Sequence, residues 1–303
     1  MTFSRYPTAQ LAAVVVVLTG VFISAVSPGR ATGAEPTNTR AIERGQRIVS
    51  AGHSFHMFVP ALLARMAADA DIEGHQQTAR QSIGGSYVHQ HWNRADDQNV
   101  VKQSLKTGEV DVLTLSPIYL PDDGIENFTR LALETNPDIR ITLQEFWLPF
   151  DVYAPDYKKS RPQPVDRNSR TAADLREIYA PYFASMDEHV RELNKKFDKQ
   201  VLYVVPAGQA TILLREKILA GEAPGLEQQN DLFRDAIGHG TPPLQALVAY
   251  CHYAVIYRRS PEGLPIPAIL DAKTYGEHAE ALNRLLQQLA WQAAREHPLS
   301  GVK

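Results

Sequence analysis

A serine near the start of the chain stands where a nucleophile could act. The segment RIVSAGHSFHMFVP, residues 47–60, begins with an apolar run, reaches Gly52 and continues into a helical pattern. We expect a strand over 47–51 and a helix over 56–70, which places Ser54 on the turn between them. Backbone N–H groups at a helix start lack intrahelical partners and could stabilise an oxyanion beside the Ser54 hydroxyl. Ser54 is therefore the candidate nucleophile, and the alternative is that it only caps the helix.

A second polar pair, Asp235 and His239, lies far along the chain in DLFRDAIGHGTPP, residues 231–243. The glycines and prolines of this segment predict a loop, from which a scaffold can present both side chains to a cleft. A nucleophilic serine needs a base that is itself oriented by a third group. His239 could be that base and Asp235 the orienting carboxylate. The same pair could instead stabilise a turn or bind a metal ion.

Further imidazole and indole side chains surround these turns. Side chains of both kinds commonly line polar clefts that bind sugars, and we expect five of them to contact substrate. These are His53, His89, His91, Trp92 and Trp147. Ordinary packing is the alternative for the tryptophans, and a zinc site that also includes His56 is the alternative for the histidines. Because no carboxylate or cysteine has ligand spacing with these histidines, we predict a site without a metal ion or another cofactor.

The remaining chain alternates apolar runs with helical patterns, which predicts an α/β fold whose parallel sheet is covered on both faces. The expected strands are 47–51, 77–82, 110–115, 139–144 and 201–205. The expected helices are 56–70, 96–107, 125–136, 171–199, 209–219, 244–257 and 274–296. Residues 150–170 interrupt the pattern with proline and charge. We expect a solvated surface insertion there, with a substrate-facing lid as the alternative.

Composition and charge narrow the class of protein. The chain has 303 residues, of which 44% are hydrophobic, and this length suits one large α/β domain. A formal net charge of −3 gives no indication of a nucleic-acid partner. Cys251 is the only cysteine, which excludes a disulfide within the folded chain and a cysteine-based metal cluster.

The first 34 residues have the pattern of a secretory signal peptide. Arg5 precedes the apolar residues 11–26, and small residues surround Ala34. We expect cleavage near Ala34, a polar arm over 35–46, and a single domain over 47–303 in a secreted or periplasmic protein. No stable membrane span is expected after cleavage. An uncleaved anchor is the alternative, although the apolar run is short for a span of about 20 residues.

Taken together, these motifs resemble those of the SGNH (GDSL-like) hydrolases. A serine after the first strand, a glycine turn after the second and a late Asp-His pair occur in the family's order over most of the chain. The resemblance implies a flavodoxin-like three-layer α/β/α sandwich with a mainly parallel sheet. It also implies a triad of Ser54, Asp235 and His239. The N–H groups of Ser54 and Gly85 would then form the oxyanion hole, with Gly84 as the donor if the register slips.

Three positions depart from the SGNH pattern. His53 precedes Ser54, where the family usually has Asp or Asn. Asp235 and His239 are one residue further apart than in the usual motif. After the third strand the chain reads SPIYLPDDG and lacks the family's oxyanion-hole asparagine, so that Ser116 stands at about its position. We expect the Ser116 hydroxyl to donate in place of the asparagine amide.

The expected function follows from the triad and from the resemblance. It is that of an exported serine esterase that hydrolyses a small-molecule or carbohydrate ester, such as an acetyl ester on a sugar. The alternative is a non-catalytic carbohydrate-binding relative that has lost the oxyanion-hole asparagine.

Overall fold

A parallel sheet forms the centre of the structure, a computed structural model that describes residues 40–160, 162–163 and 165–303. Its five strands have the order β2-β1-β3-β4-β5, and every neighbouring pair is parallel. The strands are β1 (Arg47–Gly52), β2 (Gln76–Ser82), β3 (Val112–Leu115), β4 (Arg140–Gln144) and β5 (Leu202–Val205). This order is that of flavodoxin-like sheets, so the predicted fold class is confirmed. The predicted signal peptide over 1–34 lies outside the described residues.

The strand sequences follow from the position of each strand in the sheet. Every residue of β3 and of β5 is buried, and both strands are apolar runs, as expected where helices cover both faces. β2 lies at an edge of the sheet and is polar, with the sequence QQTARQS and mostly exposed or half-buried side chains. The predicted ranges of all five strands agree with the structure to within two residues.

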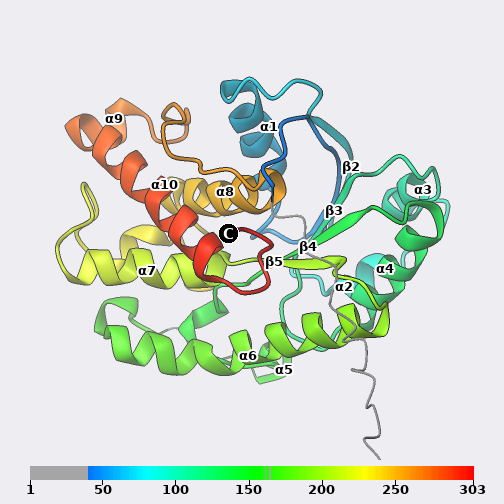
Figure 1. The fold of residues 1–303 in the computed structure, drawn as a ribbon. Coiled ribbons are helices and arrows are strands. Elements are labelled where there is room, and N and C mark those ends of the chain that lie inside the picture. Colours follow the sequence, from blue (N-terminus) through cyan, green and yellow to red (C-terminus); the bar gives the residue numbers. More distant parts are fainter. Residues whose placement is uncertain (1–39, 161, 164) are drawn as a thin grey trace, which may run out of the picture. The chain divides into compact units, whose positions relative to one another are not determined.

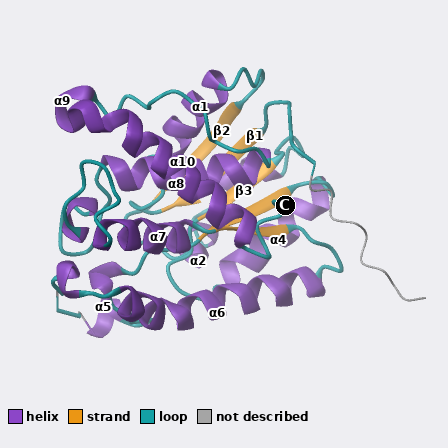
Figure 2. Cartoon of the chain, turned by 60° about the vertical axis from the view of Figure 1, so that its left-hand side comes forward, coloured by secondary structure: helices purple, strands orange, loops and turns teal. Residues whose placement is uncertain are grey.

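Two layers of helices enclose the sheet (Figures 1 and 2). One layer contains α1 (Val59–Asp69), α7 (Ala207–Leu219), α8 (Pro242–Tyr257) and α10 (Ala279–Glu296). The other contains α2 (Val88–Trp92), α3 (Val100–Leu105), α4 (Asp123–Thr135) and α6 (Ala172–Lys196). α8 packs against α1, α7 and α10 and is buried along nearly its whole length. Among the described residues, no helix combines the length and the apolar character that crossing a membrane requires.

Short elements complete the chain, and three of the predicted helices begin later than expected. They are the helices α5 (Tyr157–Ser160) and α9 (Ala272–Tyr275) and the 3-10 turns η1 (Pro149–Asp151), η2 (Arg167–Ser169), η3 (Gln229–Leu232) and η4 (Gly276–His278). The helix expected over 274–296 begins only at Ala279, because Gly276 has a φ of +52° and interrupts the helical backbone. The helix expected from residue 56 begins at Val59, and the helix expected over 96–107 extends only over Val100–Leu105.

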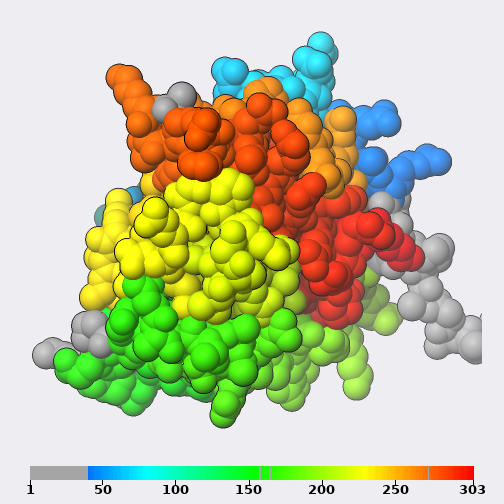
Figure 3. All heavy atoms as spheres, turned by 90° about the vertical axis from the view of Figure 1, so that its left-hand side faces the viewer, coloured from blue at the N-terminus to red at the C-terminus, as the bar shows by residue number. Residues whose placement is uncertain are grey.

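The insertion near 150–170 is anchored to the rest of the fold at both of its ends. Arg215 of α7 is fully buried and binds the buried Asp151 carboxylate through two hydrogen bonds of 2.5 and 2.9 Å. Arg170 donates to the Asp151 carbonyl at 3.1 Å, and Gln229 of η3 joins Arg215 to the Arg170 carbonyl. In Figure 3 the green and yellow segments that contain these residues lie side by side. The expectation of a merely solvated insertion is therefore wrong for its two ends.

Loss of the buried ion pair is expected to destabilise the fold strongly. Arg215→Met would leave the Asp151 carboxylate buried without its main partner, which typically costs about 3–5 kcal/mol. Urea unfolding followed by circular dichroism measures this change. Arg176→Ala is the matched control, because Arg176 forms an exposed pair with Glu216 of α7, and such pairs contribute less than about 1 kcal/mol. Equal effects of the two substitutions would contradict the prediction.

Candidate active site

Three side chains from distant parts of the chain form one hydrogen-bonded row. The Ser54 Oγ lies 2.8 Å from the His239 Nε2, and the His239 Nδ1 lies 2.6 Å from an Asp235 carboxylate oxygen. Ser54 follows β1, whereas Asp235 and His239 lie in the loop between η3 and α8, and His239 is 185 residues from Ser54 in the sequence. α1 begins at Val59, so Ser54 does not cap it, and its hydroxyl faces the imidazole. The structure thus brings together the three residues that the sequence singled out.

The Asp235 carboxylate fixes both the loop and the imidazole. One oxygen accepts the N–H groups of Gly238 and His239 at 2.9 and 3.0 Å, and the other faces the His239 Nδ1. Burial by itself would raise the pKa of Asp235, but these hydrogen bonds outweigh burial and hold the pKa below its usual value. An ionised Asp235 keeps the proton on Nδ1, so the Nε2 of His239 is free to accept the Ser54 proton.

Two aromatic rings, those of Phe55 and Trp147, form a stack that packs against the His239 imidazole. The Phe55 ring meets the His239 ring edge-on at 5.0 Å between centroids and stacks on Trp147 at 4.5 Å. Trp147 is fully buried, and its indole N–H donates to the Gly238 carbonyl at 2.7 Å. The prediction that Trp147 binds substrate is therefore wrong, because its ring is packed inside the protein and no face of it is exposed.

The loop that carries the Asp-His pair is held along its whole backbone. The carbonyl oxygens of residues 235–238 each accept a hydrogen bond from the segment 147–167. The donors are, in order, the two terminal nitrogens of Arg167, the Phe150 N–H and the Trp147 indole. Arg167 is nearly fully buried, and its guanidinium lies 4.3 Å from the centre of the Phe233 ring. Sequence reasoning missed Arg167, since its partners lie almost 70 residues away and the proline-rich segment was the only signal.

The expected oxyanion donors follow the neighbouring strands β1, β2 and β3, at the carboxyl edge of the sheet. Ala51 of β1 pairs with Leu115 of β3, so Ser116 begins the loop beside the turn that carries Ser54. The glycine turn follows β2, which pairs with β1 on its other side, and Gly85 has a φ of +57° that favours glycine. Adjacent parallel strands thus deliver Ser54, Gly85 and Ser116 to one edge of the sheet.

Two of the predicted substrate-binding histidines are core residues. His53 is buried, and its Nε2 lies 3.0 Å from the Ser116 Oγ. His91 is also buried and takes the side chains of Ser86 and Gln81 as partners at 2.7 and 3.2 Å. Both predictions of substrate contact are therefore wrong, because the rings satisfy polar groups inside the protein.

The remaining two predicted contacts differ in exposure. Trp92 is half-buried, and its ring packs edge-on against Phe128 while the Lys102 ammonium lies 4.2 Å from its centre. Packing accounts for part of the Trp92 ring, and its role as a substrate contact stays a prediction. The His89 side chain is 47% exposed and stacks on the Tyr87 ring at 5.4 Å. Of the five predicted substrate-binding residues, only His89 is exposed, whereas Trp92 is half-buried.

The histidines do not converge on a common ligand position. His56 and His252 both donate to the Gln144 side-chain oxygen, at 2.8 and 2.9 Å, whereas His53 and His91 have the separate partners described above. Within the described residues, no group of three or more potential ligand side chains could hold a metal ion. The zinc alternative is therefore not supported.

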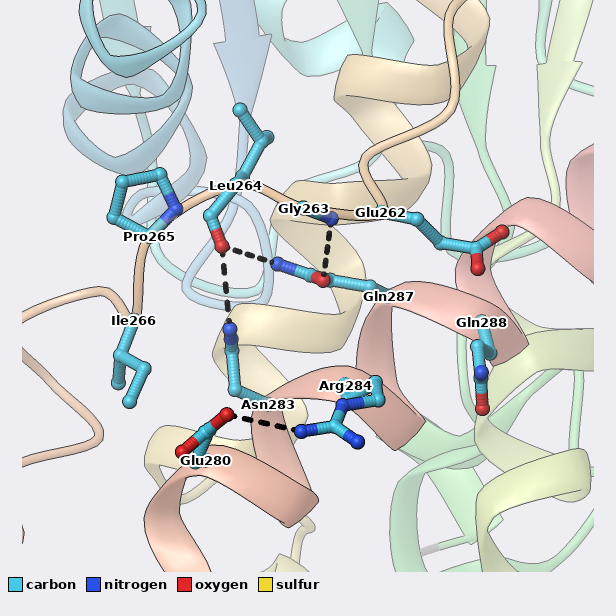
Figure 4. A pocket seen from close by; sticks show the side chains of 10 residues that line it. All are labelled: Glu262, Gly263, Leu264, Pro265, Ile266, Glu280, Asn283, Arg284, Gln287 and Gln288. Atoms are coloured by element: carbon cyan, nitrogen blue, oxygen red, sulfur yellow. Dashed lines mark hydrogen bonds and ion pairs between the residues drawn. The ribbon is translucent and has the colours of Figure 1, made fainter.

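A hollow of about 430 Å³ lies on another part of the surface (Figure 4). It is bounded by the loop 262–266 and by α10, and none of its lining residues belongs to the Ser-His-Asp row. Gln287 accepts from the Gly263 N–H and donates to the Leu264 carbonyl, to which Asn283 also donates. These hydrogen bonds hold the loop on α10.

The fold and the site together define a class: an α/β sandwich with a Ser-His-Asp row at the carboxyl edge of its parallel sheet. Comparisons with family models and with curated proteins give no match. Among solved structures, the chain is similar to a DUF4886 family protein from Bacteroides uniformis, with a TM-score of 0.55 and 13% identity over 86% of this chain and 100% of that one. At this identity, the likeness shows a common fold.

Two further solved structures have lower scores. A candidate SGNH hydrolase from Slackia heliotrinireducens matches with a TM-score of 0.43 and 14% identity, over 69% of this chain and 98% of that one. A candidate GDSL-like lipase from Parabacteroides merdae matches with a TM-score of 0.40 and 13% identity, over 69% of this chain and 94% of that one.

Proposed function

We propose that this protein is a serine hydrolase of the SGNH type that cleaves esters. One observation carries the proposal: the hydrogen-bonded row from Ser54 through His239 to Asp235, at 2.8 and 2.6 Å. Nucleophilic serines are recognised by this geometry and by the role of each group rather than by sequence position. Ser54 is also partly exposed, as a residue that reacts with a substrate must be.

In the proposed mechanism, the Ser54 Oγ attacks the acyl carbon while His239 Nε2 takes the hydroxyl proton. Asp235 holds the imidazole in the required tautomer and stabilises its charged form. His239 then protonates the departing alkoxide, which leaves as the alcohol and yields an acyl-serine. Water, deprotonated by His239, attacks this ester, and collapse of the second tetrahedral intermediate returns the proton to Ser54 and releases the acid.

The tetrahedral intermediates need donors for their oxyanion. The N–H groups of Ser54 and Gly85 and the Ser116 hydroxyl are proposed for this role, since they lie on three neighbouring turns at one sheet edge.

The proposed substrate is a carbohydrate ester, such as an acetyl ester, for which His89 and Tyr87 offer an accessible stacked pair of rings. Export through the sequence of residues 1–34 is part of the same proposal, and amino-terminal sequencing of the mature protein would test it.

A fluorophosphonate probe tests the nucleophile directly. We expect the probe to label the protein once, at Ser54, and to abolish turnover of p-nitrophenyl acetate. Peptide mass mapping identifies the labelled residue. Absence of labelling together with measurable binding of an oligosaccharide would favour the non-catalytic relative instead, and labelling at another serine would overturn the assignment of Ser54.

The anchoring of the Asp-His loop leads to a prediction about Arg167. Arg167→Met keeps an aliphatic chain against Phe233 but removes both hydrogen bonds to the carbonyls of residues 235 and 236. A misplacement of about 1 Å in a catalytic group can cost about 100-fold, so we expect kcat to fall by about 10- to 100-fold with little change in KM. Steady-state kinetics on p-nitrophenyl acetate measure this.

The control for Arg167 is a basic residue of the same insertion. Lys159→Met changes an exposed side chain, and we expect its kcat to equal that of the wild type. If Arg167→Met also retained full kcat while its melting temperature fell, Arg167 would serve stability alone.

A further inference from the structure

His53, which immediately precedes the proposed nucleophile, turns its ring into the protein. Only 1% of the residue is exposed, and the ring lies edge-on to Phe55 and Phe146 at 5.7 and 5.1 Å between centroids. Burial, and then the nearby His56, lower the pKa of His53 to about 3. The ring is therefore neutral under physiological conditions and carries one proton on one of its two nitrogens.

Backbone geometry decides which nitrogen carries this proton. The Phe55 N–H donates to the His53 Nδ1 at 3.2 Å, so Nδ1 is an acceptor and the proton is on Nε2. The Nε2 lies 3.0 Å from the Ser116 Oγ, and both groups are buried. The His53 N–H must therefore donate to the Ser116 oxygen.

Ser116 is left with a proton that has to be donated elsewhere. A hydroxyl has one donor hydrogen, and the hydrogen bonds of the described residues give the Ser116 hydroxyl no partner other than His53. Ser116 begins the loop after β3, beside the turn that carries Ser54. An oxyanion formed on the acyl carbon at Ser54 is an acceptor at this edge of the sheet.

We propose that Ser116 is a catalytic oxyanion donor and that His53 is the positioning residue that commits the Ser116 hydroxyl to donation. This inference rests on the proposed function and goes beyond it. A carboxamide N–H₂ can only donate, whereas a hydroxyl can also accept and so turn its proton away from the reacting oxygen. A neighbouring N–H that occupies the hydroxyl oxygen removes that freedom, so the pair of Ser116 and His53 does what an asparagine amide would do alone.

A double-mutant cycle tests the coupling between the two residues. Ser116→Ala is expected to lower kcat on p-nitrophenyl acetate by about 10²- to 10³-fold, the usual effect of losing one oxyanion donor. His53→Phe keeps an aromatic ring between Phe55 and Phe146 and is expected to lower kcat by about tenfold, the effect of one ordinary hydrogen bond. KM should change little in either variant.

The decisive measurement is the double variant. If His53 acts through Ser116, adding His53→Phe to Ser116→Ala lowers kcat no further. An unchanged tenfold loss in that background would show that His53 acts through packing alone, and a Ser116→Ala variant with wild-type kcat would show that Ser116 is not a donor. His53→Gln, whose amide nitrogen can donate to Ser116, should retain more activity than His53→Phe and serves as the second variant if the phenylalanine form does not fold.

Labelling separates this inference from the proposed function. Both single variants should still react with the fluorophosphonate at Ser54, more slowly than the wild type. A wild-type protein that neither reacts nor turns over ester would overturn both proposals. A wild type that does both, together with an additive cycle, would overturn the role of His53 only.

Discussion

Ser54→Ala is expected to lower kcat on p-nitrophenyl acetate by about 10⁴-fold or more and to abolish fluorophosphonate labelling. Removal of the nucleophile leaves only the catalysis that oxyanion donors and substrate binding supply. The fold should be almost unaffected, because Ser54 does not cap α1 and its hydroxyl has His239 as its partner. Steady-state kinetics and thermal melting of the purified variant measure the two effects.

The matched control is another serine whose hydroxyl has only a structural partner. Ser104 of α3 donates to the Val100 carbonyl within the helix, so Ser104→Ala should keep full activity. If Ser54→Ala hydrolysed the ester at the rate of the wild type, the proposed function would be wrong.

Asp235→Asn is expected to produce the second largest loss, about 10³- to 10⁴-fold in kcat. The asparagine oxygen can still accept the N–H groups of Gly238 and His239, so the loop should keep its shape. The new amide nitrogen, however, would donate to the His239 Nδ1 and place the imidazole proton on Nε2. That nitrogen then cannot accept the Ser54 proton.

The pKa shift of Asp235 adds a pH test. Because the folded-state pKa lies below the unfolded value, the ionised carboxylate stabilises the native protein at higher pH. This contribution is lost as the pH falls through the folded-state pKa, and it should be absent from the Asp235→Asn variant. Melting curves of wild type and variant across the acidic range, with kinetics at neutral pH, measure both effects.

A neighbouring carboxylate provides the control for Asp235. Asp231 accepts the N–H groups of Glu227 and Gln228 and does not contact His239, so Asp231→Asn should change kcat less than tenfold. If Asp235→Asn behaved like Asp231→Asn, Asp235 would be a turn stabiliser, which is the alternative that the sequence left open.

The strand predictions succeeded because strands buried on both faces are apolar runs between turn residues. β3 and β5 show this pattern, and their place in a parallel sheet follows from the helices between strands. Helix boundaries were less accurate. The five-residue α2 was not predicted, since a helix of fewer than two turns is too short to show a periodic pattern. The break at Gly276 depends on a backbone conformation that glycine permits but does not require.

The sequence by itself determined the α/β class and the residue types at the sheet edge: a serine after the first strand and an Asp-His pair in a late loop. Both depend on local patterns that span only a few residues. Only the tertiary structure decided that Trp147 and His53 face inward and that Arg167 holds the loop of the Asp-His pair. These outcomes depend on packing between segments that are tens of residues apart in the sequence. A pattern of residue types along the chain does not specify the distance between such segments or the direction in which their side chains point.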